Sequence, residues 1–227
     1  MIFNKYIMED SPNVGIEVQN RAWFNVNFTS QFFYVPGLIS ILMVIISFLT
    51  ASISIVKEKE VGRIEQIMVT PIKTYEFIIG KTFPFLIIGY IVMTLMLISS
   101  FTIYGISVKG SYLLLYAVAG IFICGNLGAA TIISVISTTQ QQALLTSFFF
   151  MLPSVMLSGI MFPIRNMPIP VQNATMLNPI RWFFQSLIGI VIKGASFTDL
   201  IKPISAQCIL ATLFISLAII LFKKKSS

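Results

Sequence analysis

The sequence contains no histidine and only two cysteines, Cys124 and Cys208. Without histidine, the chain cannot build a catalytic triad or a metal site that depends on an imidazole. Both cysteines lie inside apolar runs, so we interpret them as small buried hydrophobic side chains rather than as a disulfide or a metal pair. We therefore expect no catalytic residue, no metal site and no cofactor bound by this chain.

Charged residues are also scarce. They make up 10% of the 227 residues, whereas 56% are hydrophobic and the mean hydropathy is +0.91. Soluble domains carry about 25% charged residues. This composition predicts an integral membrane protein of the all-α class, a polytopic bundle of helices in the lipid bilayer. The net charge of +7 is explained by basic residues flanking membrane spans, and we expect no nucleic-acid partner.

Five apolar segments approach or exceed the about 20 residues that a helix needs to cross a bilayer. Not one Asp, Glu, Lys or Arg falls inside them. The shortest is interrupted by Pro153. Ion-coupled carriers usually place ionisable groups near the membrane midplane, so their absence disfavours a secondary carrier. The predicted spans are 35–56, 83–104, 112–136, 143–160 and 204–222.

The distribution of Lys and Arg predicts the orientation. The loop 57–81 carries five of them, the tail 223–227 carries three, and the loop 137–142 carries none. With five spans these three segments share one face. Because basic residues concentrate in cytoplasmic loops, we expect this face, and with it the C-terminus, to be cytoplasmic.

The segment Pro179–Ile192 is apolar but has only 14 residues and contains Arg181. Asn178 followed by Pro179 is typical of a helix start, and Gly194 of a helix end. This length suits a re-entrant or interfacial helix better than a span. We predict an outer re-entrant helix here, on the side opposite to the loop 57–81.

A charged elbow follows the first apolar segment, and its sequence begins Lys57-Glu58-Lys59-Glu60. Apolar residues between positions 61 and 68 share one side of a helical wheel, which predicts a short amphipathic helix. A second surface helix would start at Thr70-Pro71 and turn into the membrane near Gly80 and Pro84. The pattern alone leaves open the alternative of a solvated loop with the ordinary charges of a cytoplasmic turn.

The stretch "IVKEKEVGRIEQIMVTPI" resembles the cytoplasmic signature of type-2 ABC transporter permeases, the membrane subunits of ABC exporters of the multidrug and lipid-linked export class. The stretches "GKTFPFLIIGY", "SGIMFPIRNMPIPVQNATMLNPIRWF" and "VIKGASFTDL" resemble further parts of the same family. The resemblance covers nearly the whole chain from Arg21, and Arg63 stands where the family commonly has threonine.

The resemblance implies a permease that forms the substrate pathway in a bacterial inner membrane and hydrolyses nothing itself. Its partners would be an ABC ATPase subunit, which uses the ATP, a second permease subunit, and in some systems a periplasmic adaptor. The residues it implies for ATPase coupling are Glu58, Glu60, Gly62, Arg63, Glu65, Gln66, Thr70 and Pro71. Those it implies for an outer gate and re-entrant loop are Gly159, Phe162, Pro163, Met167, Pro168, Asn178 and Pro179.

Members of that family begin with an additional span and a large extracytoplasmic domain. The expectation from the resemblance is that this chain corresponds to the C-terminal five-span part of a six-span permease and does not transport alone. Residues 1–34 would be an extracytoplasmic remnant, 35–222 the transmembrane domain and 223–227 a cytoplasmic tail. The alternative functions are a non-transporting permease remnant or assembly protein and, less in keeping with the empty spans, an ion-coupled carrier.

The segment 112–136 carries a patch of small residues, which allows helices to approach closely. The patch packs either against another helix of this chain or at a seam between two permease subunits, and both remain open at this point. Its members are Gly120, Gly125, Asn126, Gly128, Ala129 and Ala130.

Overall fold

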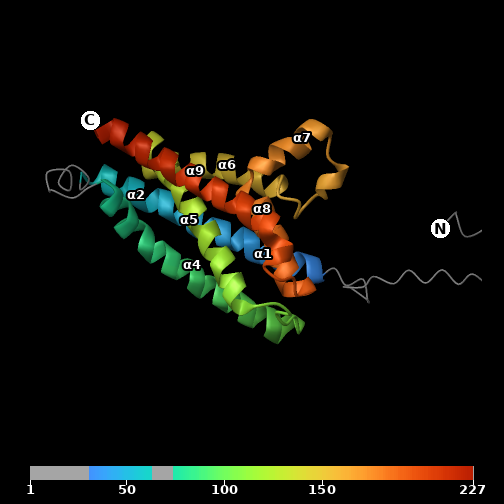
Figure 1. Cartoon of the computed structure of the whole chain (residues 1–227). Helices are drawn as coiled ribbons and strands as arrows, with labels where there is room; N and C mark the ends of the chain where they lie inside the picture. Colours follow the sequence, from blue (N-terminus) through green and yellow to red (C-terminus); the bar gives the residue numbers. More distant parts are fainter. Residues whose placement is uncertain (1–30, 63–73, 227) are drawn as a thin grey trace, which may run out of the picture.

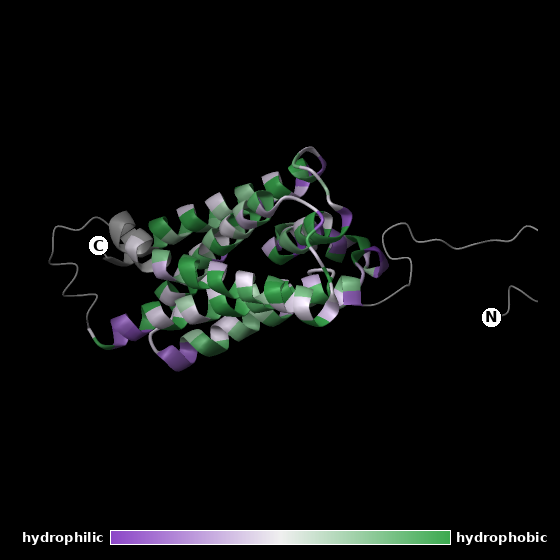
Figure 2. Ribbon diagram, turned by 90° about the horizontal axis from the view of Figure 1, so that it is seen from below, coloured by the Kyte–Doolittle hydropathy of each residue, from purple (hydrophilic) through white to green (hydrophobic). Residues whose placement is uncertain are grey.

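The structure is a computed structural model that describes residues 31–62 and 74–226. All regular secondary structure in these two ranges is helical. The long helices lie side by side and run between two ends of an elongated bundle (Figure 1). Hydrophobic residues line its length, and hydrophilic residues gather toward its ends, as Figure 2 shows. The predicted class, a polytopic all-α helix bundle, is confirmed.

The first long helix is a continuous 30-residue unit. It consists of α1 (Gln31–Val44), a π-helical turn η1 (Ile45–Leu49) and α2 (Thr50–Glu60). The helix therefore continues past the predicted span and carries the four charges of the elbow on its last turn. It ends where Gly62 adopts φ +72°, a left-handed conformation that glycine reaches without steric cost.

The helix α4 (Thr74–Tyr104) is a single element of 31 residues. The predicted turn near Gly80 and Pro84 is therefore wrong, because the chain passes both residues without leaving the helix, whereas the predicted helix start at Thr70-Pro71 lies outside the described residues. Pro84 deletes only one hydrogen bond of the helix, to the carbonyl of Gly80. In an apolar environment every other backbone group still needs an internal partner, which favours continuing the helix over breaking it.

The helices α5 (Tyr112–Ile136), α6 (Gln140–Met156) and α9 (Ile201–Ser226) complete the bundle. Among the described residues, four helices are long and apolar enough to cross a membrane, namely 31–60, 83–104, 112–136 and 198–221. The helix α6 has 17 residues, fewer than the about 20 that span a bilayer, so the fifth span stays a prediction.

Short elements connect α6 to α9. They are η2 (Ile164–Asn166), α7 (Ile169–Ala174), η3 (Thr175–Leu177), α8 (Pro179–Ile188), η4 (Gly189–Lys193) and η5 (Thr198–Leu200). The helix at α8 and η4 begins and ends as the sequence predicts. The Asn178 side chain caps it, Pro179 is its first residue, and Gly194 closes it with φ +66°.

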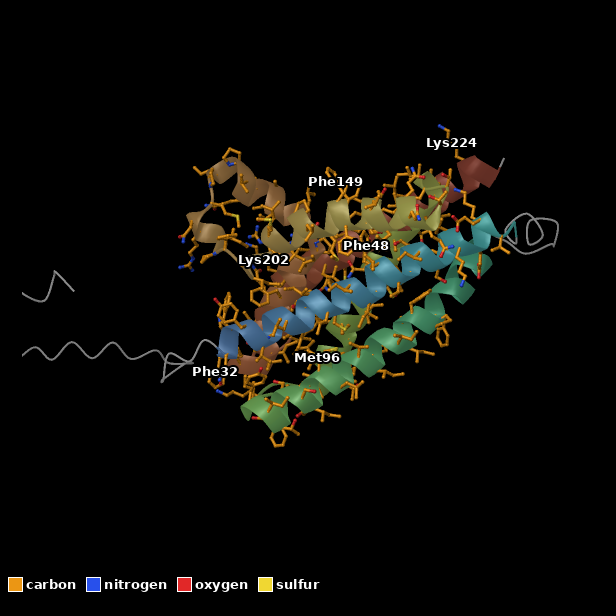
Figure 3. The ribbon with its side chains drawn as sticks, turned by 180° about the vertical axis from the view of Figure 1, so that it is seen from behind. Phe32, Phe48, Met96, Phe149, Lys202 and Lys224 are labelled. Atoms are coloured by element: carbon orange, nitrogen blue, oxygen red, sulfur yellow. The ribbon has the colours of Figure 1, made fainter. Side chains whose placement is uncertain are left out.

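The two ends of the bundle hold different parts of the chain. The Glu60 end contains the end of α2, the α5–α6 turn and the end of α9 (Figure 1), as the charge distribution predicts. The Lys109 end contains the start of α1, the loop 105–111 and most of the segment 157–200. Figure 3 shows Phe32 and Lys224 at these opposite ends. Both α6 and α9 meet the connecting segment at the Lys109 end, so α8 adds no crossing.

The helix α5 is the centre of the bundle. Of its most apolar stretch 72% is buried, against 22% for α4 and 28% for α9. Its Phe122 stacks on Phe183 of α8 with 4.1 Å between ring centroids. The outer faces of α4 and α9 carry exposed Ile, Leu and Phe side chains, which is the surface that a bilayer covers without cost.

Candidate functional site

The charges of the elbow lie on the last turn of α2. Lys57 and Glu60 are exposed, whereas Glu58 and Lys59 are half-buried. The backbone N–H of Gly62 donates to the Lys59 carbonyl at 3.1 Å, which closes the helix. Of the predicted amphipathic helix in positions 61–68, the structure describes only Val61 and Gly62, which form the turn after α2, and the rest lies outside the described residues. The other predicted coupling residues, namely Arg63, Glu65, Gln66, Thr70 and Pro71, lie outside the described residues.

Lys59 binds the C-terminal end of α5. Its Nζ donates to the carbonyl of Ser137 at 2.6 Å and to that of Val135 at 3.4 Å. The last carbonyls of a helix lack partners within the helix, and they carry the negative end of its dipole. A half-buried ammonium at this position satisfies two such carbonyls and is stabilised by the dipole.

Glu60 binds the N-terminal end of α6. Its carboxylate accepts hydrogen bonds from the backbone N–H of Gln140, at 3.0 Å, and from the Gln140 side-chain amide. These two bonds, the side-chain one first, lower the pKa of the Glu60 carboxyl below its ordinary value. Gln140 is the first residue of α6, so the carboxylate meets the positive end of that helix dipole.

The α5–α6 turn between these two helix ends is short and held by its own side chains. The Thr139 hydroxyl accepts from the Gln142 backbone N–H at 3.2 Å. The Gln142 side-chain oxygen accepts from the backbone N–H of Thr138 at 2.8 Å and from its hydroxyl at 2.9 Å. This pattern is close to a capping box, in which a threonine and a glutamine three residues later satisfy free helix donors.

The α5–α6 turn was not predicted to be part of the site, because 137–142 carries no charge. The spacing of Thr139 and Gln142 predicts a helix start at this turn, but it does not indicate which distant residues contact the turn. The contacts join positions 76 to 80 residues apart, which local patterns do not reveal.

The predicted outer gate residues form a loop that ends in a helix cap. Gly159, with φ +90°, allows the chain to turn after α6. Phe162 is 55% exposed, Pro163 and Pro168 are also exposed, and Met167 is half-buried. The loop is held by the Gln172 side chain, which donates to the Met167 carbonyl at 2.8 Å.

Asn178 joins two helices with one amide group. Its side-chain oxygen accepts from the Ile180 backbone N–H at 3.1 Å, and its nitrogen donates to the Ser154 carbonyl at 2.6 Å. The first bond caps the start of α8. The second satisfies one of the last carbonyls of α6, which have no partner within the helix. Asn178 is 8% exposed, so it fixes the end of α6 to the start of α8.

Arg181 folds the outer loop back onto α8. Its guanidinium donates to the Gln172 carbonyl at 3.2 Å and to the Thr175 hydroxyl, and it lies 4.9 Å from the centre of the Trp182 ring. The sequence marked Arg181 only as a reason why this helix is no span. In the structure it is a polar link between α8 and the two short helices before it.

The small-residue patch of α5 packs within this chain. A Cβ built on Gly128 would lie 2.9 Å from the Ile215 backbone nitrogen of α9, and one on Gly125 would lie 3.2 Å from the Ala211 Cβ. The Asn126 side chain donates to the Ser47 hydroxyl of η1 at 3.2 Å. Of the two interpretations of the patch, these contacts favour packing inside one chain.

Comparison with known proteins identifies the family. A family model described as ABC-2 family transporter protein matches residues 4–220. The probable multidrug ABC transporter permease YbhR of Escherichia coli K12 is 32% identical over 98% of this chain and 61% of YbhR. The related YbhS of that strain is 32% identical over 92% of this chain and 56% of YbhS.

A more distant relative is the linearmycin resistance permease protein LnrN of Bacillus subtilis, which is 25% identical over 71% of this chain and 42% of LnrN. No solved structure matches the chain. The chain spans 61% or less of the length of these three relatives. With its long apolar helices and a family match over 4–220, this multi-pass membrane protein belongs to the ABC-2 family of transporter proteins.

Proposed function

We propose that this chain is the membrane-spanning permease part of an ATP-driven ABC exporter. The observation that carries the proposal is the family match over residues 4–220 together with 32% identity to proteins named multidrug ABC transporter permeases. The apolar segments support it, because they contain no ionisable residue that would relay a proton or a sodium ion. Energy then has to enter from outside the membrane.

The energy source in this proposal is a separate cytoplasmic ABC ATPase that contacts the loop 57–81. The Glu60 end of the bundle is the cytoplasmic one, because the loop 57–81 and the tail concentrate the basic residues there. The C-terminus is then cytoplasmic, and the Lys109 end, with Phe162 and the prolines of the outer loop, faces the outside. A second permease subunit completes the pathway.

The cargo is an apolar or amphipathic molecule that enters from the bilayer. The names of YbhR and YbhS point to drugs as the substrate class of those proteins, and the interior of this chain fits such cargo. Among the described residues the buried polar side chains carry hydroxyl or amide groups without charge, such as Ser52 and Ser147, whose hydroxyl oxygens lie 2.7 Å apart. An interior with uncharged groups does not compensate the desolvation of an ion.

The test is to isolate the tagged protein from its native membranes and to identify an ABC ATPase that copurifies with it. ATP hydrolysis of that ATPase in lipid nanodiscs is then measured with and without the membrane subunit. In this proposal Glu65 faces a basic group of the partner. Glu65→Lys would place two positive charges against each other, and it should therefore abolish copurification. Lys224→Glu, an exposed charge on α9, is the control. The proposed coupling is wrong if no ABC ATPase copurifies with the wild-type protein, or if the ATPase copurifies with the Glu65→Lys variant as well as with wild type.

A further inference from the structure

We propose that Lys59 and Glu60 form a clamp that transmits movement of the loop 57–81 to the α5–α6 turn. The inference rests on the proposed function, because it takes an ATPase acting on this loop as the source of movement. Lys59 and Glu60 are positioning residues in this proposal. They hold two helix ends of their own chain, and they are not the surface that the ATPase touches.

The signs of the two charges match the two helix ends that they contact. An antiparallel pair of helices joined by a short turn presents a negative and a positive dipole end side by side. Lys59 lies on the negative end, at the carbonyls of Val135 and Ser137, and Glu60 lies on the positive end, at Gln140. Adjacent residues of opposite sign on one helix therefore bind the whole turn.

A second contact fixes the same helices deeper in the bundle. The Ser52 hydroxyl of α2 and the Ser147 hydroxyl of α6 lie 2.7 Å apart and are both fully buried. The helices α2 and α6 are thus joined at two levels, by Glu60 with Gln140 and by Ser52 with Ser147. Two contacts along the helices prevent α6 from rotating against α2, whereas one contact would allow rotation about it. The end of α2 and the start of α6 therefore move together.

The clamp lies at the end of α2, directly before the chain enters the loop. Gly62 reverses the backbone with φ +72° two residues after Glu60, and a Cβ at Gly62 would meet nothing within 4 Å. The other neighbour of the loop, α4, is 22% buried along its apolar stretch. The helix α4 also contacts α5, but α2 contacts both α5 and α6, so a displacement of the loop reaches the start of α6 through α2 and the clamp.

The first experiment compares charge variants in the complete exporter with its ATPase. Lys59→Met removes the contact with α5, and the double variant K59E/E60K opposes both helix dipoles at unchanged net charge. We expect both variants to retain membrane levels and copurification of the ATPase but to lose permease-dependent stimulation of ATP hydrolysis. Lys59→Arg keeps the charge and the hydrogen-bond donors, so this variant should retain the stimulation of ATP hydrolysis. Lys224→Met should behave as wild type.

The outcomes separate this inference from the proposed function. If wild type neither binds nor stimulates an ATPase, the proposed function fails. If wild type stimulates and K59E/E60K stimulates equally, the clamp fails and the proposed function stands. If Lys59→Met lowers ATPase binding as much as stimulation, Lys59 contacts the ATPase directly, and the clamp is also wrong.

A reversible cross-link tests the clamp even if a charge variant folds poorly. In a background with Cys124 and Cys208 replaced by alanine, Glu60→Cys and Gln140→Cys are joined by a short, reducible, thiol-reactive bifunctional reagent. We expect low stimulation before cross-linking, wild-type stimulation after it, and low stimulation again after reduction. Inhibition by the cross-link would mean that the two helix ends separate during the cycle, which overturns the proposal. Stimulation that is normal in all three states would show that the contact is not needed.

Discussion

Gly128→Ala should destabilise the protein through the packing of α5 on α9. These two helices share the most extensive contact of the bundle. A Cβ on Gly128 would lie 2.9 Å from the Ile215 backbone nitrogen, 3.0 Å from the Phe214 carbonyl carbon and 3.1 Å from an Ile215 side-chain carbon. Two of these atoms belong to the α9 backbone, so no rotamer change relieves the overlap, and the helices have to move apart.

The size of the effect follows from two opposing terms. Overpacking a well-packed core costs about 1–3 kcal/mol. Replacing glycine by alanine in a helix returns about 0.5–1 kcal/mol through lower backbone entropy. Because the overlap is with backbone atoms, the cost belongs in the upper half of the first range, about 2–3 kcal/mol, and we expect the free energy of unfolding to fall by about 1–2.5 kcal/mol in Gly128→Ala. The assay is equilibrium unfolding in mixed detergent micelles, with the unfolding temperature of the purified protein as a second measurement.

Two further glycines make the comparison quantitative. A Cβ on Gly80 of α4 would meet nothing within 4 Å, so Gly80→Ala should be neutral or slightly stabilising. A Cβ on Gly120 would overlap the Tyr90 hydroxyl at the far end of a flexible side chain, so Gly120→Ala should cost less than Gly128→Ala. Equal stability of Gly128→Ala and wild type would refute the close approach of α5 and α9, and with it the assignment of this patch to packing inside the chain.

Three further predictions concern the cap at α8 and the topology. Asn178→Ser keeps a capping oxygen but cannot reach Ser154 and should lose about 1 kcal/mol of stability, whereas Asn178→Ala should lose about 2 kcal/mol, measured by the same unfolding assay; equal losses would show that the capping oxygen contributes nothing, and an Asn178→Ser variant as stable as wild type would show the same of the bond to Ser154. Single cysteines at Lys57 and at Asn166, in the background without native cysteines, should differ in intact cells, with only Asn166→Cys labelled by an impermeant thiol reagent; labelling at Lys57 would reverse the orientation. Reporters fused after Asn166 and after Lys193 should behave alike, because α8 does not cross the membrane, and opposite behaviour would mean an additional span.

The parts of the fold that local chemistry determines were predictable from the sequence. The Asn178-Pro179 start and the Gly194 end of α8 follow from capping preferences that act within a few residues. The long apolar segments predicted the main helices, because a helix forms its backbone hydrogen bonds within its own segment. The shortness of α8 predicted a helix that does not span, and this stays a prediction for the reporter fusions to test.

The parts that depend on distant contacts were not predictable. The pattern of positions 61–68 predicted an amphipathic helix, and that helix stays a prediction, because the structure describes only Val61 and Gly62 of these positions. Gly80 and Pro84 are local signals for a break, and the need of a long apolar helix for internal hydrogen bonds overrides them. Only the fold shows that Lys59 and Glu60 contact a turn 76 to 80 residues away.

The order of the charges at Lys59 and Glu60 is the strongest reason to assign these two residues a different role from the rest of the elbow. A cytoplasmic turn that only needed solubility would accept Lys-Glu or Glu-Lys equally. Here the first charge faces a helix C-terminus and the second a helix N-terminus, and reversing the order would place each against the dipole end of its own sign. Lys59 and Glu60 are thus used inside the chain. In the proposed coupling, a partner ATPase would therefore act on the loop after Gly62, and its movement would reach the bundle through a helix end that is attached to two others.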